Sequence, residues 1–174
     1  KPLAGTRPNI ILVMTDDQGM GDLSCMGNEV LRTPNLDRFY ALSTRLTDFH
    51  VSPTCAPTRS AIMSGRHEFR NGVTHTIKER ERMALSTTTF PQLLAKSGYQ
   101  TGIFGKWHLG AKPHTPQSQG LDVNFAGFRG GMPPGGYFSP YKNPELTDGP
   151  KGEHLTERLT DEALKFIDQS KDQP

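Results

Sequence analysis

The sequence is poor in cysteine, with only Cys25 and Cys55 among its 174 residues. It also lacks a long apolar run, since the longest, residues 10–14, is far shorter than the roughly 20 residues of a membrane-spanning helix. The net charge is only +2 and the basic residues are scattered, so the positive patch typical of nucleic-acid-binding proteins is missing. These absences exclude a disulfide-dense scaffold and argue against a membrane span and a nucleic-acid partner.

Glycine and proline, in contrast, are abundant, with 18 and 14 residues. They concentrate in residues 111–152, where we predict one long loop without a regular element. A loop of this length in a compact domain usually carries function. The rest of the composition, 33% hydrophobic and 22% charged, is that of a globular protein long enough to bury its own core.

Strand and helix signals alternate along the chain. Residues 9–15 are β-branched and apolar on both faces, which predicts a buried parallel strand, and residues 45–51 and 100–104 predict two more strands. Capping residues and helical periodicity predict helices over residues 33–42, 57–63, 90–96 and 155–167. The alternation predicts an α/β fold with a mostly parallel sheet flanked by helices.

Two features are interpreted as structural. The charged run of residues 78–82 predicts a solvated surface. An oxidising compartment would allow a bridge between Cys25 and Cys55, but we expect Cys55 to have another use and Cys25 to be a buried thiol.

The strongest motif is Cys-Ala-Pro-Thr-Arg at residues 55–59. Pro57 favours the start of a helix, which puts Cys55 at its amino end, where free N–H groups and the helix dipole attract an anion. Arg59 follows one turn later and adds a fork of donors suited to a tetrahedral oxyanion. The motif predicts an anion site; an ordinary helix start with a buried thiol is the alternative.

Two weaker motifs follow predicted strands. Asp16 and Asp17 come after residues 9–15, and adjacent carboxylates repel unless a hard cation such as calcium or magnesium neutralises them. Lys106 and His108 come after residues 100–104, and in extended backbone they would place a cation beside a proton-transfer group. Taken alone, each motif is better explained without a function, the first as a solvated turn and the second as a polar surface.

Together the three motifs resemble the sulfatase family, the type I formylglycine-dependent enzymes of the alkaline-phosphatase-like superfamily. The resemblance covers residues 7–110 nearly continuously and returns in residues 143–163. It implies an alkaline-phosphatase-like fold and the hydrolysis of sulfate monoesters. The family places further metal ligands and a second His and Lys later in its chains, without a match here. We therefore expect residues 1–174 to be the amino-terminal portion of a catalytic domain, inactive without the remainder.

The resemblance also implies how the nucleophile arises. A formylglycine-generating enzyme would oxidise Cys55 to formylglycine, whose hydrate offers one hydroxyl to attack sulfur and a second to expel sulfate. Arg59 would stabilise the charged hydrate. Thr58 departs from the family pattern, in which serine is commoner at this position.

The remaining motif residues receive roles in the same way. The resemblance implies that Asp16 and Asp17, with the hydrate at position 55, hold Ca²⁺, with Mg²⁺ as the alternative. Lys106 would bridge the nucleophile and the sulfate, and His108 would take the proton of the second hydroxyl during release.

Substrate and function stay open in several respects. The sulfate ester could be a sulfated small molecule or a sulfated carbohydrate, with specificity expected in residues 111–152. A phosphonate or phosphate monoester hydrolase on the same scaffold, or a catalytically silent binding protein with an unmodified Cys55, are the other functions considered. Because the sequence begins at Lys1 without methionine, we expect that an upstream segment was removed and that the location is secreted, periplasmic or lysosomal.

Overall fold

The computed structural model describes residues 4–174, which divide into two compact units. The larger unit comprises residues 4–10 and Ser52–Pro174, and the smaller comprises Ile11–Val51. Within the described part of the chain, no helix is both long enough and apolar enough to cross a bilayer.

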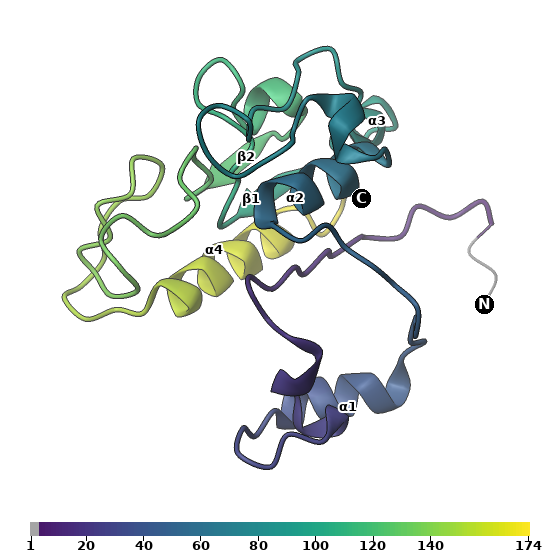
Figure 1. The fold of residues 1–174 in the computed structure, drawn as a ribbon, viewed down its shortest axis with the longest axis vertical. Helices are drawn as coiled ribbons and strands as arrows, with labels where there is room; N and C mark the ends of the chain where they lie inside the picture. Colours follow the sequence, from purple (N-terminus) through teal and green to yellow (C-terminus); the bar gives the residue numbers. More distant parts are fainter. Residues whose placement is uncertain (1–3) are drawn as a thin grey trace. The chain divides into compact units, whose positions relative to one another are not determined.

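The larger unit is built around a small parallel sheet. Phe104 of one strand stacks on Phe125 of the other with ring centroids 5.4 Å apart, and Phe166 of the last helix lies 5.6 Å from Phe104. This last helix therefore covers the sheet, as Figure 1 shows for α4 beside β1. The elements are α2 (Cys55–Ser64), α3 (Phe90–Lys96), β1 (Gly102–Phe104), β2 (Val123–Phe125) and α4 (Leu155–Gln169), with 3-10 turns at Glu68–Asn71 and Gln117–Gln119.

The helices of this unit lie where the sequence predicts them, because their end signals are local. Thr89 caps α3: its Oγ1 accepts from the Gln92 amide at 3.4 Å, and its own amide donates to Gln92 Oε1 at 3.1 Å. Gly65 ends α2 in the left-handed region, with φ 64°. The predictions of helices at 57–63 and 90–96 are thus confirmed, with α2 beginning two residues earlier than expected.

Two apolar clusters form the core of the larger unit. The first lies beneath α2, and the second lies between α4 and the end of β2. Partly buried Met63 and Ile103 extend the first cluster, and Phe125 and Leu159 the second. The first consists of Ala56, Val73, Met83, Trp107, Leu109 and Leu121, and the second of Ala126, Tyr141, Leu146 and Leu155.

The prediction that residues 111–152 hold no regular element was wrong, because they contain β2. Its three residues are too few for a periodic signal, and its pairing is set from outside the strand. Asp122 accepts from the Thr101 amide at 2.9 Å, and the Asp122 amide donates to the Thr101 carbonyl at 3.0 Å. These bonds hold the start of β2 beside β1 in parallel register.

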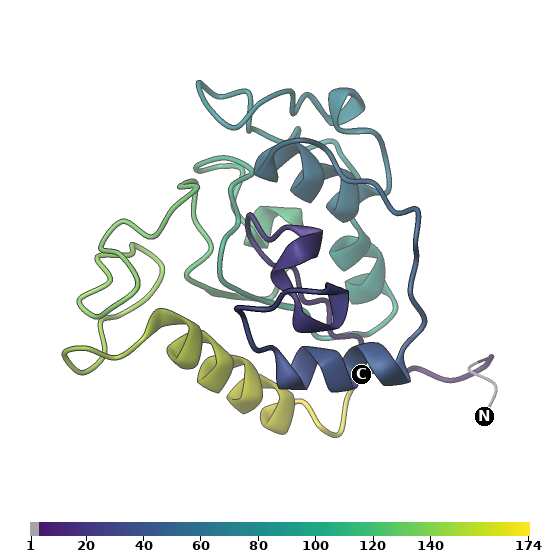
Figure 2. The ribbon, with the colours of Figure 1, turned by 60° about the horizontal axis from the view of Figure 1, so that its bottom comes forward.

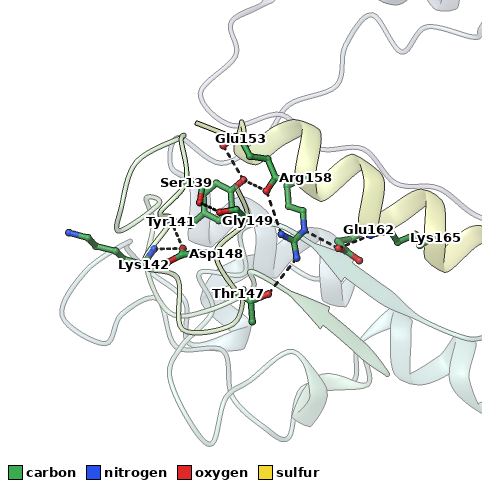
Figure 3. Close-up of polar contacts among 10 residues, drawn as sticks. All are labelled: Ser139, Tyr141, Lys142, Thr147, Asp148, Gly149, Glu153, Arg158, Glu162 and Lys165. Carbon is green, nitrogen blue, oxygen red and sulfur yellow. Dashed lines mark hydrogen bonds and ion pairs between the residues drawn. The ribbon is translucent and has the colours of Figure 1, made fainter. Parts of the chain in front are cut away.

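The end of this long loop is tied to α4 by a polar network (Figure 3). The buried Tyr141 hydroxyl donates to Glu153 Oε2 at 2.8 Å, and Arg158 on α4 reaches the same oxygen at 3.4 Å. Arg158 Nε also donates to Glu162 Oε1 at 2.9 Å. Burial first, and then the bond to the Glu153 carboxylate, raise the pKa of Tyr141 to about 12. This end of the loop is therefore held to α4 by hydrogen bonds and ion pairs.

The smaller unit holds α1 (Pro34–Leu42) and two 3-10 turns, Met20–Asp22 and Ser24–Met26, which Figure 2 shows beside it. Asp37 joins them: its carboxylate accepts from the Ser24 hydroxyl at 2.7 Å and from the Cys25 amide at 3.0 Å. The bond from Ser24 is the main reason that the pKa of Asp37 lies below its ordinary value. The predicted helix 33–42 is confirmed, and both cysteines of the chain are free.

The strands predicted at residues 9–15 and 45–51 were wrong. Both segments are irregular, and their apolar side chains are exposed, with Ile11 at 72%, Val13 at 81% and Phe49 at 64%. A buried strand needs a hydrogen-bonded neighbour and a covering helix, which an apolar pattern cannot supply. Among the described residues, the parallel pairing of the predicted α/β fold is limited to β1 and β2, and most regular structure is helical.

Candidate functional site

Cys55 is the first residue of α2, as the motif predicts, and its side chain is half-buried. Ala56 and Pro57, the next two residues, are buried, so the first turn of the helix is fixed on the first apolar cluster. Thr58 Oγ1 lies 2.9 Å from the carbonyls of both Ser52 and Thr54 and holds the chain that leads into the helix. Thr58 therefore has a structural role at the position where the family that the sequence resembles more often has serine.

His108 lies against Cys55. Its Nδ1 is 3.3 Å from the Cys55 Sγ atom, and its Nε2 is 3.0 Å from the Thr76 carbonyl oxygen. Because a carbonyl only accepts, Nε2 carries the proton of the neutral ring, and Nδ1 faces the thiol as an acceptor. The geometry brings together two residues that are 53 positions apart in the sequence.

The backbone at His108 is strained, with φ 58° in the left-handed region that few residues other than glycine adopt. We expected the segment that carries Lys106 and His108 to be extended, but its backbone turns at the histidine. Trp107 and Leu109 on either side are 1% and 0% exposed and belong to the same cluster as Ala56. The core that supports Cys55 also imposes the conformation of His108.

The surroundings of His108 favour a neutral ring. Burial lowers the pKa of His108, and the positive charges of Lys106 and Arg59 lower it further, whereas the bond to the Thr76 carbonyl raises it. The net direction is below the ordinary value of 6.5. A neutral imidazole can accept a proton, which is the property a general base needs.

Arg59 and Lys106 complete this cluster. Arg59 is 8% exposed, and its Nη1 donates to the Lys106 carbonyl, which ties α2 to the segment after β1. Lys106 is half-buried. Four predicted site residues therefore gather in the larger unit, with two cationic side chains near a helix amino end, an arrangement that can hold a tetrahedral oxyanion.

The far half of α2 is secured by a buried amide. Asn71 is 1% exposed, and its Nδ2 lies 3.0 Å from Ser60 Oγ and 2.6 Å from Ser64 Oγ. The helix that carries Cys55 is thus bonded to the 3-10 turn that follows it.

Asp16 and Asp17 lie in the smaller unit. Both are exposed, and Asp17 has φ 54°. Their donor atoms are carboxylate oxygens, the type that calcium and magnesium prefer. Among residues 4–174, no group of three or more histidine, cysteine, aspartate or glutamate side chains gathers where a metal ion could bind. The predicted pair fits a hard cation in its chemistry and would supply part of its ligands.

Sequence reasoning missed Glu81. The run 78–82 is exposed as predicted except at Glu81, which is 3% exposed and accepts from Arg129 Nε at 3.0 Å. The sequence shows only that Glu81 stands two positions before the apolar Met83, a spacing that puts both side chains on one side of an extended backbone. In the structure both are buried, and Arg82 between them is exposed. A charged residue in phase with a buried methionine points inward.

The chain belongs to the Sulfatase family, which matches residues 8–174. It is 40% identical over 125 residues to arylsulfatase G of Canis lupus familiaris and 41% identical over 121 residues to steryl-sulfatase of Homo sapiens. These alignments cover 70% and 64% of this chain but only 23% and 21% of the relatives. The chain thus spans about a quarter of the length of these curated relatives.

Solved structures agree. The PsFucS1 sulfatase from Pseudoalteromonas sp. superposes with a TM-score of 0.79 at 26% identity, covering 98% of this chain and 42% of that one. BT4656, solved with its substrate D-glucosamine-2-N,6-O-disulfate, superposes with a TM-score of 0.73 at 28% identity, covering 97% and 33%. The architecture of this chain is therefore that of one portion of a sulfatase fold.

Proposed function

We propose that the protein to which this chain belongs hydrolyses sulfate monoesters, with Cys55 as the residue converted to formylglycine. The observation that carries the proposal is the contact between Cys55, at the amino end of α2, and a buried histidine held in a strained conformation. Membership of the Sulfatase family supports it. Sulfated carbohydrates are the proposed substrate class, because BT4656 was solved with a disulfated glucosamine and Ps i-CgsB with a neocarrahexaose.

The chain's own residues would act on the sulfate as follows. Arg59 and Lys106 supply cationic donors for the sulfate oxygens and the charge that develops on them. His108, neutral because of its burial and its cationic neighbours, accepts a proton at Nδ1, the atom that faces position 55. The bond from Nε2 to the Thr76 carbonyl holds the ring in this orientation. A formylglycine at position 55 would supply hydroxyl groups in place of the thiol.

Asp16 and Asp17 would hold a divalent cation, calcium or magnesium, that neutralises a sulfate oxygen when bound. Two carboxylates do not complete the coordination of such an ion, so other parts of the longer protein would provide further ligands. A formylglycine-generating enzyme is the partner that the proposal requires. The secreted, periplasmic or lysosomal location stays a prediction.

The proposal is tested by comparing hydrolysis of an aryl sulfate and an aryl phosphate by the complete protein and by its Cys55→Ala variant. We expect hydrolysis of the sulfate, with Cys55→Ala at background. Equal turnover by the variant would contradict the role of Cys55. A preference for the phosphate would instead favour a phosphate or phosphonate monoester hydrolase on this scaffold.

A further inference from the structure

A second polar pair lies beside the candidate site. Glu81 is almost fully buried, and only one of its carboxylate oxygens is bonded, with Oε1 accepting from Arg129 Nε at 3.0 Å. The other oxygen, Oε2, is buried without a hydrogen-bond partner in the described part of the chain. An ion pair between a half-exposed arginine and a buried carboxylate with one unsatisfied oxygen contributes little net stability. The role of Glu81 is therefore better explained by its positioning of the Arg129 side chain than by a contribution to stability.

The loop that carries Arg129 packs directly on His108. The His108 amide donates to the Phe128 carbonyl at 3.1 Å. On the other side of Arg129, a Cβ added to Gly131 would lie 2.7 Å from the His108 ring, so the backbone there touches the imidazole. Arg129 thus extends from a stretch of backbone that contacts the histidine on both sides of it.

Most N–H donors of the Arg129 guanidinium have no partner in the described part of the chain. Its side chain is 51% exposed, and only Nε is bonded, to Glu81. The two terminal amino groups donate to no residue between positions 4 and 174. Because a buried carboxylate fixes the guanidinium from behind, the outer edge is a preorganised fork, which suits a sulfate or a carboxylate.

We propose that Arg129 is a specificity-determining residue. It binds a second anionic group of the substrate, next to the sulfate ester that reacts with residue 55. The inference rests on the proposed function and narrows its substrate class to carbohydrates with at least two anionic groups. The second group is a sulfate or a carboxylate, both of which accept two parallel N–H bonds from arginine.

The test measures binding rather than turnover, so that it does not depend on hydrolysis. The complete protein with Cys55→Ala is titrated by calorimetry with three matched saccharides: one monosulfated, one disulfated, and one with a sulfate and a uronate carboxylate. We expect tighter binding of at least one dianionic saccharide than of the monosulfated one. Adding Arg129→Gln is expected to lower that preference by about 10- to 100-fold. The disulfated and uronate arms identify the group.

Two variants keep the test decisive. Arg129→Gln leaves Glu81 buried and unpaired and could destabilise the fold, so Glu81→Gln/Arg129→Gln removes both charges together. We expect the double variant to lose the preference as well. Lys171→Gln removes one exposed charge beyond α4 and is expected to keep it.

The inference is overturned if the double variant keeps the parent's preference for a dianionic saccharide, or if the parent has no such preference. It is also overturned if Arg129→Gln weakens the binding of all three saccharides equally. A preference that depends on Arg129 in a protein that cleaves no sulfate ester would contradict the proposed function and leave the anion site standing.

Discussion

Leu109 offers the sharpest test of how the core supports the site. It is fully buried next to His108, in the same cluster as Ala56. Leu109→Ala removes three carbon atoms, each worth about 0.8 kcal/mol of transfer free energy, and leaves a cavity. The expected loss in the free energy of unfolding is about 3–5 kcal/mol.

The assay is thermal and urea unfolding of the complete protein, followed by circular dichroism. Leu164→Ala is the matched control, because Leu164 on α4 is 58% exposed and its loss should change the free energy by no more than about 0.5 kcal/mol. If the two variants unfold alike, the cluster does not support the segment that carries His108, and the reasoning is refuted.

Three further predictions concern the same unit. Asn71→Ala removes both bonds to the serines of α2, so a loss of about 1–3 kcal/mol is expected in urea unfolding; no loss would contradict the bonds. The pKa of Tyr141 is raised to about 12, so the folded state holds this proton more tightly than the unfolded state. The resulting stability is complete below pH 10 and decreases as pH rises toward 12, a decrease that melting curves of Tyr141→Phe should lack. Gly131→Ala pushes a methyl group into the His108 ring, and we expect kcat of the complete protein to fall by about 10- to 100-fold; an unchanged kcat would show that the ring has room to move.

The helices of this fold could be predicted because their signals are local. Thr89 and Gln92 cap α3 from within four residues, and Gly65 ends α2 next to its last turn. Among the predicted strands, the one at residues 100–104 is confirmed by β1, whereas those at 9–15 and 45–51 are wrong, because pairing depends on residues far apart in the chain. Residues 9–15 have the stronger apolar pattern and form no strand, whereas β2 has almost none and pairs with β1.

The candidate site divides in the same way. The spacing of Cys55 and Arg59 was enough to predict an anion site, because residues four positions apart lie about one turn apart on a helix. The contact of Cys55 with His108 spans 53 residues and the pair of Glu81 with Arg129 spans 48, distances at which only tertiary packing decides. The sequence pattern identified Cys55 and His108 as site residues without predicting their contact. It identified neither Glu81 nor Arg129.

The central claim is that Cys55 is converted to an aldehyde in the mature protein. Its most direct test is the mass of the tryptic peptide that contains Cys55, isolated from the complete protein made alongside a formylglycine-generating enzyme, together with its reaction with a hydrazide probe. We predict the mass of the aldehyde and labelling by the hydrazide. A peptide that retains an intact thiol, from a preparation that hydrolyses sulfate esters, would contradict the account.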